Sequence, residues 1–382
     1  MAVIGLVGPF GSGCTFVANI IKNEHSYEYI SLSDILREKY CEKFGSEANG
    51  RSELQDFGND FRRENGSAAL AVEAIDKLDD NKKYIIDSIR NPEEIRFLRN
   101  NIPNFFLIGV FAEKEKRYTR VAKLYNNDKR EFEKDDKRDS GESESFGQQV
   151  TNSFRQSDIV ILNNDFCRNN NKAYAELKAK IKDKVDIIEG TISFRPTAHE
   201  TYMTMAYASS MRSSCLKRKV GAVIVDESGS VFSSGYNEVP KMQNTCLEEY
   251  GECYRDSLKK GFKQSLNEEL KDDETTNKIF GKFKTNFKIL DYCRALHAEE
   301  NAIVNVAKSG SSQLNKAFLY TTTYPCNLCA NKIVQVGIKN VVYFEPYPME
   351  EAKRILEEGN VKQIPFEGVT YNGYFRLMEV VD

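Results

Sequence analysis

Residues 296–303 read Leu-His-Ala-Glu-Glu-Asn-Ala-Ile, and residues 324–330 read Tyr-Pro-Cys-Asn-Leu-Cys-Ala. The first stretch opens a segment with helical periodicity that we expect to stop at Gly310. The second is expected to open another helix at Pro325, because proline suits the first helical position. A strand-like run over 317–322 separates the two. The sequence therefore predicts that both stretches lie at the starts of neighbouring helices in an α/β layer.

Three side chains in these stretches match the ligand set of a metal site. Cys326 and Cys329 are three positions apart, so a helix places both on one face of its first turn. A helix N-terminus also favours negative charge, which lowers the pKa of a thiol and makes thiolate available to a metal. His297 completes the set from the other helix, and three protein ligands leave one tetrahedral position for water. We therefore predict one catalytic Zn²⁺ held by these three side chains.

Glu299 is the candidate proton carrier of the same site. It follows His297 by two residues, and we expect it beside the metal without being a ligand. We assign it the transfer of a proton from the attacking water to the substrate ring and then to the departing amine. A C-x-x-C pair alone is typical of a structural zinc knuckle or a redox pair, and H-x-E alone indicates little. Their combination, with Pro325 in place and 28 residues between His297 and Cys326, favours a catalytic site.

H-x-E combined with P-C-x-x-C is the signature of zinc-dependent nucleobase deaminases. From about Glu200 to Glu345 the chain resembles the cytidine and deoxycytidylate deaminase superfamily. Segments 218–225 and 231–236 resemble the first two core strands of that superfamily. The resemblance implies a three-layer α/β/α fold that converts cytosine to uracil by hydrolysis. Free deoxycytidine nucleotides, dCMP, dCTP or both, are the implied substrates.

The resemblance also implies where the substrate binds. Residues 235–240 read Gly-Tyr-Asn-Glu-Val-Pro, and in deoxycytidylate deaminases the asparagine of this segment contacts the sugar. Asn237 is therefore assigned to substrate binding, together with Ala298 and Pro325, which flank the metal ligands. Related enzymes form closed oligomers, commonly hexamers, so we expect a homo-oligomer.

Strand-like and helix-like segments alternate over residues 1–190, which predicts a mostly parallel sheet covered by helices on both faces. The expected strands are 3–7, 29–32, 84–89, 105–111 and 158–162. The predicted fold class is α/β throughout. An N-terminal phosphate-loop, kinase-like domain over 1–190 precedes the deaminase-like domain over 191–382.

Residues 8–15 read Gly-Pro-Phe-Gly-Ser-Gly-Cys-Thr between an expected strand and an expected helix, where backbone N–H groups and the helix N-terminus bind phosphates. Cys14 occupies the position of the lysine that normally reaches the β- and γ-phosphates, which disfavours phosphoryl transfer. Asp87 ends another strand, where a carboxylate would organise Mg²⁺, and Arg90 follows it as a candidate positive charge. The residues assigned to nucleotide or phosphate binding are Gly8, Gly11, Ser12, Gly13, Cys14, Thr15 and Asp87.

This half resembles the nucleoside-monophosphate kinase branch of the phosphate-loop folds. With Cys14 in the lysine position, the resemblance implies a regulatory site for a dNTP or ATP, and a glycine-rich turn that binds nothing is the open alternative. The fusion of the two halves resembles bacterial anti-phage dCTP deaminases, which convert dCTP and dCMP to their uracil forms and deplete the pool that a virus needs. That resemblance also implies an inhibitory RNA or protein partner.

A charged insertion over 241–290 interrupts the deaminase-like half. It contains Cys246 and Cys253, with Cys293 just after it and Cys215 upstream. Two interpretations are open. Some of these thiols hold a second, structural zinc, as in related deoxycytidylate deaminases, or they are unpaired cysteines in a partly mobile insertion.

Composition bears on the remaining alternatives. The formal net charge of −3 over 382 residues disfavours a large polyanionic partner. A polynucleotide deaminase acting on tRNA or single-stranded DNA is the alternative function, and it would need a basic, aromatic-lined groove. A non-catalytic regulator with a structural zinc is a third hypothesis, which Glu299 opposes because a structural site needs no proton carrier. Nine cysteines and the lack of a membrane-spanning apolar run predict a reducing, cytoplasmic location.

Overall fold

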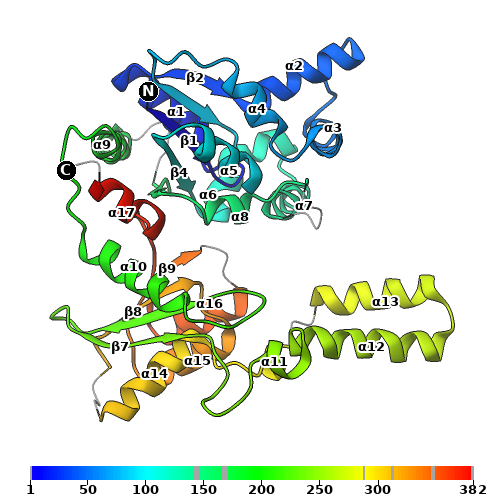
Figure 1. Ribbon diagram of the computed structural model, residues 1–382, viewed down its shortest axis with the longest axis vertical. Helices are drawn as coiled ribbons and strands as arrows, with labels where there is room; N and C mark the ends of the chain where they lie inside the picture. The colour runs from blue at the N-terminus through cyan, green and yellow to red at the C-terminus, as the bar shows by residue number, and fades with distance from the viewer. Residues whose placement is uncertain are drawn as a thin grey trace. The chain divides into compact units, whose positions relative to one another are not determined.

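The computed structural model describes residues 2–141, 146–165, 171–286, 289–310, 314–345 and 349–379, which fold into two compact units (Figure 1). The first unit comprises Met1–Glu200 and Glu367–Asp382, and the second comprises Thr201–Phe366. Both units are α/β, as the sequence predicted. None of the helices within the described ranges combines the length and the apolar character that a membrane crossing requires.

The expected division into 1–190 and 191–382 differs from the observed units in two respects. The first unit extends into helix α10 (Ala198–Ser210). The chain also returns to the first unit near its C-terminal end, where β11 (Gly368–Val369) pairs antiparallel with β5 (Ile159–Leu162). This pairing joins segments that are far apart in the sequence, so no local pattern predicts it.

The first unit is built on a six-stranded sheet with the order β11-β5-β4-β1-β3-β2. Its remaining strands are β1 (Val3–Val7), β2 (Glu28–Ser31), β3 (Tyr84–Asp87) and β4 (Phe105–Phe111). Its helices are α1 (Cys14–His25), α2 (Leu32–Phe44), α3 (Arg51–Asn65), α4 (Ala69–Ile75), α5 (Pro92–Asn101), α6 (Lys114–Val121), η1 (Ala122–Tyr125), α7 (Lys129–Ser140), α8 (Val150–Phe154), α9 (Asn171–Ile188) and α17 (Tyr371–Glu379).

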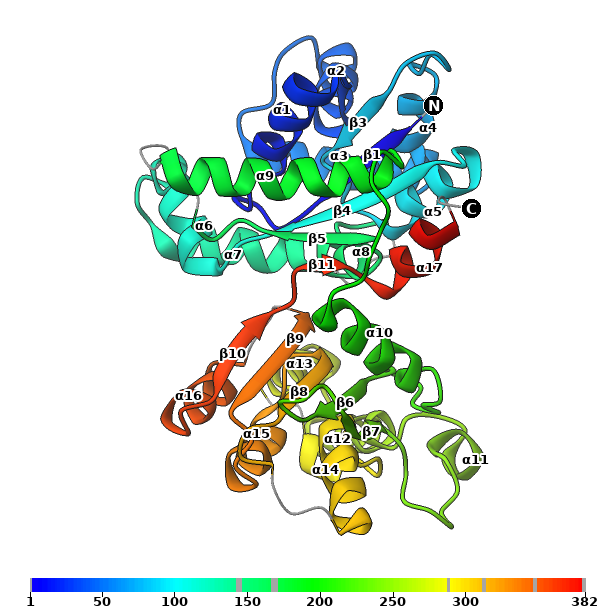
Figure 2. The same cartoon turned by 90° about the vertical axis from the view of Figure 1, so that its left-hand side faces the viewer.

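The five strands from β1 to β5 all pair in parallel with their neighbours in the sheet, which confirms the predicted mostly parallel sheet. Successive side chains of a strand point to opposite faces, and β1 supplies both cores of this unit. Ile4 and Leu6 lie in one buried cluster with side chains of α1 and α9, which pack together (Figure 2). Val3 and Val7 lie in another with side chains of α2, α4 and α5. Both faces of the sheet are therefore covered by helices.

The second unit has a five-stranded sheet with the order β10-β9-β8-β6-β7. β6 pairs antiparallel with β7 and β8, whereas β8, β9 and β10 run parallel. The strands are β6 (Gly221–Val225), β7 (Val231–Tyr236), β8 (Phe318–Thr323), β9 (Asn340–Glu345) and β10 (Lys362–Pro365). The helices besides α10 are α11 (Cys246–Tyr250), α12 (Tyr254–Leu270), α13 (Asp273–Asn286), η2 (Leu290–Tyr292), α14 (Ala298–Ser309), α15 (Asn327–Gln335) and α16 (Glu350–Glu358).

Helix α14 lies very close to strand β7, and Gly235 makes this possible. A Cβ atom at Gly235 would lie 2.3 Å from the carbonyl oxygen of Ala298 and 2.4 Å from the backbone nitrogen of Ala302. The Asn301 side chain also donates a hydrogen bond to the carbonyl of Tyr236 over 3.0 Å. These contacts fix the start of α14 against the sheet, which is where the predicted metal ligand His297 lies.

The insertion over 241–290 is largely helical, which the sequence did not indicate. Helices α12 and α13 run antiparallel and pack against one another (Figure 1). The backbone of Lys271 joins them with positive φ, and Asp272 accepts hydrogen bonds from the first backbone N–H groups of α13. Residues 287 and 288 of the insertion lie outside the described residues.

Candidate active site

The three predicted metal ligands converge in the second unit. Sγ of Cys326 lies 3.2 Å and Sγ of Cys329 lies 3.3 Å from Nδ1 of His297. The three ligand atoms all lie within 4.8 Å of one another. Across the described residues, this is the one group of three or more histidine, cysteine or acidic side chains arranged to hold a metal ion. The convergence joins two sequence segments that the chain separates by a strand.

Local contacts explain why His297 faces the two thiols. His297 precedes α14 as its N-cap, and its neighbour Leu296 forms an antiparallel bridge with Glu238 in which the Leu296 N–H donates over 2.9 Å. The Glu300 carboxylate accepts from the His297 backbone N–H over 3.4 Å. Its other oxygen lies 3.0 Å from Nζ of Lys332 on α15. This ion pair links the two ligand-bearing helices.

Helix α15 begins later than the sequence predicted. We expected the helix to open at Pro325, but it starts at Asn327, and Cys326 is its N-cap with extended backbone. The Cys326 carbonyl accepts the first helical hydrogen bond from the Ala330 N–H over 2.8 Å. Cys329 is in the first turn, so the cap and the turn present both thiols to one point. The expected proximity of the two thiols holds, although Cys326 is not itself helical.

The three side chains of the cluster are coupled to one another by hydrogen bonds. Hydrogen bonds with Cys329 and His297 lower the pKa of the Cys326 thiol to about 4. Hydrogen bonds with Cys293 and Cys326 raise the pKa of His297 to about 10. The hydrogen bond with Cys326, together with burial, raises the pKa of Cys329. The anionic charge is thus favoured at the sulfur atom of Cys326, and a donor set of two sulfurs and one imidazole nitrogen fits Zn²⁺.

Glu299 lies beside the cluster and is 3% exposed. Its Oε2 accepts from Sγ of Cys329 over 3.6 Å, and its Oε1 accepts from Oγ1 of Thr321 over 3.4 Å. Burial raises the pKa of the Glu299 carboxyl. The carboxyl is therefore oriented by strand β8 and placed next to the ligands, in an environment that favours its protonated form more than water does.

The three residues assigned to substrate binding differ in their surroundings. Oδ1 of Asn237 accepts from the Val220 N–H over 2.7 Å, and Nδ2 donates to the Arg218 carbonyl over 2.8 Å. Asn237 therefore braces the segment that enters β6, which the sequence did not indicate. Ala298 is buried as the first residue of α14, and Pro325 is buried directly before Cys326. Their contacts with substrate stay a prediction.

The cysteines outside the ligand set do not form a second cluster within the described residues. Cys215, Cys246 and Cys253 are free thiols outside any group arranged to hold a metal. Cys293 instead hydrogen-bonds His297, which lowers the pKa of the Cys293 thiol. Neither of the two interpretations left open by the sequence, a second zinc or unpaired cysteines, includes this contact of Cys293. Its spacing of four residues from His297 was the only available signal for the contact that the structure shows.

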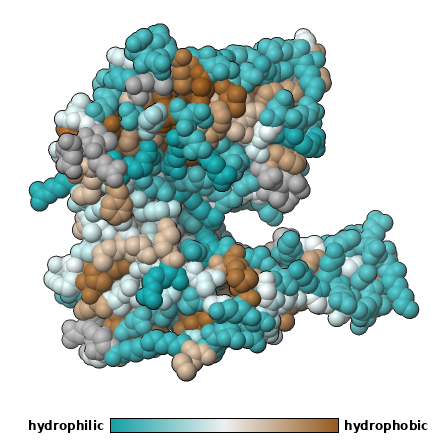
Figure 3. Space-filling view, viewed as in Figure 1, coloured by the Kyte–Doolittle hydropathy of each residue, from teal (hydrophilic) through white to brown (hydrophobic). Residues whose placement is uncertain are grey.

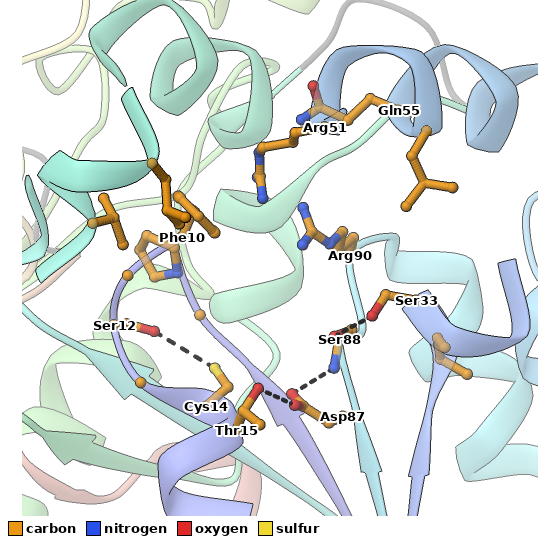
Figure 4. Close-up of a pocket in the computed structure, with 18 of the residues that line it drawn as sticks. Phe10, Ser12, Cys14, Thr15, Ser33, Arg51, Gln55, Asp87, Ser88 and Arg90 are labelled. Atoms are coloured by element: carbon orange, nitrogen blue, oxygen red, sulfur yellow. Dashed lines mark hydrogen bonds between the residues drawn. The ribbon is translucent and has the colours of Figure 1, made fainter. Parts of the chain in front are cut away.

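The phosphate loop of the first unit has the geometry expected of an anion-binding turn. Gly11 and Gly13 have φ of 81° and 98°, in the left-handed region that favours glycine, and Gly13 directly precedes α1. Oγ1 of Thr15 donates to Oδ2 of Asp87 over 2.8 Å (Figure 4). The hydroxyl of Tyr29 donates to the same oxygen over 3.0 Å. Thr15 and Asp87, both singled out from the sequence, are therefore partners beneath the loop.

Three other residues that the sequence assigned to phosphate binding, Gly8, Ser12 and Cys14, make contacts within or next to the turn. A Cβ atom on Gly8 would lie 2.3 Å from the carbonyl oxygen of Val110, so only glycine fits where β1 ends beside β4. Oγ of Ser12 lies 3.5 Å from Sγ of Cys14. Burial and the negative charge of Asp87 raise the pKa of Cys14 to about 12, so this thiol is neutral and does not replace the charge of a lysine.

A cavity of about 1760 Å³ adjoins the loop and has cationic side chains on its other wall. Arg51 and Arg90 face the loop there (Figure 4), and both form ion pairs with the buried carboxylate of Asp139. The Arg51 guanidinium also lies 3.9 Å from the ring centroid of Phe10. Burial and the charge of Arg90 lower the pKa of Arg51. Nothing in the sequence singled out Arg51, because it lies on a helix far along the chain from the loop.

Comparison with known families agrees with this arrangement of two units. Residues 196–345 match the family model described as the cytidine and deoxycytidylate deaminase zinc-binding region. Residues 7–139 match the model described as an AAA domain. The first match contains the entire ligand cluster, and the second contains the phosphate loop and the arginines of the cavity wall.

Individual relatives give the same assignment. A deoxycytidylate deaminase of Schizosaccharomyces pombe is 28% identical over 356 residues, which is 92% of each chain. The deoxycytidylate deaminase of Enterobacteria phage T4 is 33% identical over 151 residues, covering 38% of this chain and 77% of the phage protein. The solved dCMP deaminase of cyanophage S-TIM5 is 26% identical, covers 45% of this chain and 100% of its own, and has a TM-score of 0.31. The chain belongs to the deoxycytidylate deaminase family of zinc-binding deaminases.

Proposed function

We propose that this protein hydrolyses the 4-amino group of free deoxycytidine nucleotides, converting dCMP, dCTP or both to the uracil forms. One observation carries the proposal: two thiols and an imidazole meet within 4.8 Å, with the buried Glu299 carboxyl 3.6 Å from Cys329. A structural metal site needs no carboxyl group of this kind. The related proteins named deoxycytidylate deaminase support the nucleotide class.

Zinc, when bound by His297, Cys326 and Cys329, lowers the pKa of water towards ~7 and so provides a nucleophile at neutral pH. The side chains of the protein then move the protons. We assign Glu299 to accept a proton from the attacking water and to deliver it to ring nitrogen N3, because burial raises the pKa of its carboxyl group and so makes the carboxylate a better proton acceptor than one in water. Formation of the C4–O bond gives a tetrahedral adduct that is protonated at N3. Glu299 then takes the remaining proton from the C4 hydroxyl group and passes it to the amine. The C4–N bond breaks as the C4=O bond forms, and ammonia leaves.

The test is a substrate panel with the purified wild-type chain. It comprises deoxycytidine, dCMP, dCTP, CMP, CTP and a cytosine-containing oligonucleotide, with released ammonia and uracil products measured separately. We expect conversion of the deoxynucleotides and little turnover of ribonucleotides. Turnover of the oligonucleotide alone would replace this proposal with a polynucleotide deaminase.

We further propose that the protein consumes dCTP in cells and thereby limits viral DNA synthesis. The fusion of a phosphate-loop unit to the deaminase unit supports this role. Expression of the wild type, but not of a Glu299→Gln variant, should lower cellular dCTP after phage infection and reduce the number of plaques. Equal plaque numbers with both variants, despite active enzyme, would exclude the defence role while leaving the chemistry intact.

We assign the cavity of the first unit to a regulatory nucleotide, a dNTP or ATP, with Mg²⁺ near Thr15 and Asp87. Glycines in the left-handed region, the N-terminus of α1 and the arginine wall are suited to bind phosphates. The neutral Cys14 in place of a lysine supports binding without phosphoryl transfer. Robust ATP hydrolysis or kinase activity of the wild type would contradict this assignment.

A further inference from the structure

Helices α12 and α13 of the insertion form a hairpin that has almost no core of its own. Of the residues described in the two helices, only Thr276 is buried. The rings of Phe262 and Phe283 pack at 4.6 Å between centroids, yet Phe262 is still 42% exposed. Leu270 and Ile279 are each 39% exposed. Because helix pairs in water depend on burying an apolar face, this hairpin is expected to gain stability from a partner.

The charges of the hairpin are sorted along its length. The end at which the two helices are joined, residues 268–274, carries five carboxylates and a single lysine. The middle and the opposite end of the helices are rich in lysine. On the view in Figure 3, hydrophilic residues cover most of the hairpin. The carboxylates are Glu268, Glu269, Asp272, Asp273 and Glu274, and the lysines are Lys259, Lys260, Lys263, Lys278, Lys282 and Lys284.

This charge pattern is complementary to itself when one hairpin is reversed. Helix α12 has 17 residues and is therefore about 25 Å long. A second hairpin laid antiparallel to the first places its acidic end beside the lysine-rich end of its neighbour. A two-fold axis repeats that contact, so both acidic ends are matched at once. The same pairing covers the exposed apolar side chains of both hairpins and completes a bundle of four helices.

We propose that the α12–α13 hairpin is a docking surface for a second copy of this chain. A partner with one sign of charge fits the hairpin less well. A nucleic acid would be attracted to the lysines and repelled by the five carboxylates of the same element, and a basic partner would meet the reverse mismatch. A second copy matches both ends and supplies an apolar surface of the same kind. This surface is independent of the zinc cluster and of the deaminase assignment.

The test uses charge reversal in the full-length protein. An acidic-end variant carries Glu268→Lys and Glu269→Lys, and a lysine variant carries Lys259→Glu and Lys263→Glu. A control variant carries Glu42→Lys and Glu64→Lys in the first unit, whose side chains are 68% and 60% exposed. Molar mass is measured by light scattering after size-exclusion chromatography, with circular dichroism and zinc content as checks of folding.

Each reversed variant should lose the contact, because its two substituted residues then face residues of the same sign on the neighbouring hairpin, and its assembly should have a smaller molar mass than the wild type. The control should keep the wild-type mass. An equimolar mixture of the two variants should recover that mass, since each end again faces its opposite. A chain with all four substitutions should recover it as well, which distinguishes lost contact from misfolding. Wild-type mass in both separate variants, or no recovery in the mixture and the combined chain, would overturn the proposal.

Discussion

Glu299 differs chemically from the three side chains beside it, because we assign its carboxyl group to proton transfer and those three side chains to holding the metal. Glu299→Gln keeps the size of the side chain but removes its ability to accept a proton. We expect turnover to fall by about 10²- to 10⁴-fold, the usual contribution of general acid–base catalysis, with zinc content unchanged. Steady-state kinetics on dCMP and metal analysis measure the two quantities.

The matched control is Glu300→Gln, one residue further along the same helix. Glu300 lies in the capping contact with His297 and in the ion pair with Lys332, but it does not contact the reacting centre. This variant should keep most of its turnover. A Glu299→Gln variant with wild-type turnover would remove Glu299 from the mechanism.

Cys293 supports the metal site through its hydrogen bond with His297. Partners that orient a ligand are typically worth about 10- to 100-fold in metal affinity. We therefore expect Cys293→Ala to weaken zinc binding by that range without abolishing it, as judged by competition with a chelator. Cys215→Ala, which removes a thiol outside the cluster, should leave affinity unchanged. Complete loss of zinc from the Cys293→Ala variant would instead indicate that Cys293 is itself a zinc ligand.

The convergence of His297, Cys326 and Cys329 beside Glu299 was predictable from the sequence, because both segments were expected at the starts of neighbouring helices. Their roles as metal ligands and proton carrier stay predictions. The contact of Cys293 and the position of Arg51 were not predictable. The contact of Cys293 depends on the path of the backbone over the four residues to His297, and the position of Arg51 depends on how distant segments pack. The residue types alone report neither. Asn237 shows the same limit, since its side chain binds backbone at Arg218 and Val220.

Among the elements, the predicted strands 3–7, 105–111 and 231–236 match the structure residue for residue. The first two are apolar runs that lie next to turn residues, Gly8-Pro9 after the first and Pro103-Asn104 before the second, so the pattern indicates where they lie. The helices of the hairpin could not be predicted in this way. Only one of the residues described in these two helices is buried, so no core-facing stripe reveals the helical period.

The phosphate loop joins β1 to α1 through backbone that only glycine adopts easily. At Gly13, φ is 98°, and an added Cβ would lie 2.5 Å from Nδ2 of Asn163. We expect Gly13→Ala to lower the affinity for dTTP or ATP at least about tenfold, because strain of roughly 1–3 kcal/mol displaces the N–H groups that bind phosphate. Isothermal titration calorimetry measures the affinity, and zinc content should not change.

Gly45→Ala is the matched control for the loop variant. Gly45 also has positive φ, 69°, at the end of α2, but an added Cβ there meets nothing within 4 Å. It should cost some stability and leave nucleotide affinity intact. If the wild type and Gly13→Ala bound the nucleotide with equal affinity, the loop would have no part in nucleotide binding.

At the scale of the whole molecule, the first unit is not one continuous stretch of the sequence. The first unit is completed only by residues that follow the entire deaminase unit. Val369 and Leu377 are fully buried in one of its cores, and the Arg376 guanidinium lies 2.9 Å from the buried carboxylate of Asp158. A domain boundary placed at residue 191 from the sequence does not include these C-terminal residues in the first unit. Strand β11 has only two residues, which is too short for a recognisable strand pattern.

Truncation after Phe366 should therefore destabilise the first unit, not the unit next to it in sequence. Loss of two buried apolar side chains, at about 1.5–3 kcal/mol each, and of one of the two arginine partners of the buried Asp158 carboxylate corresponds to about 5 kcal/mol or more. For a unit of this size we expect the midpoint of its thermal unfolding to fall by roughly 10 °C or more. Calorimetry and limited proteolysis measure the unfolding of the first unit, and zinc content reports whether the second unit is intact. If the truncated chain lost zinc while the unfolding of the first unit stayed unchanged, residues 367–379 would belong energetically to the deaminase unit, and the division of the molecule would need to be redrawn.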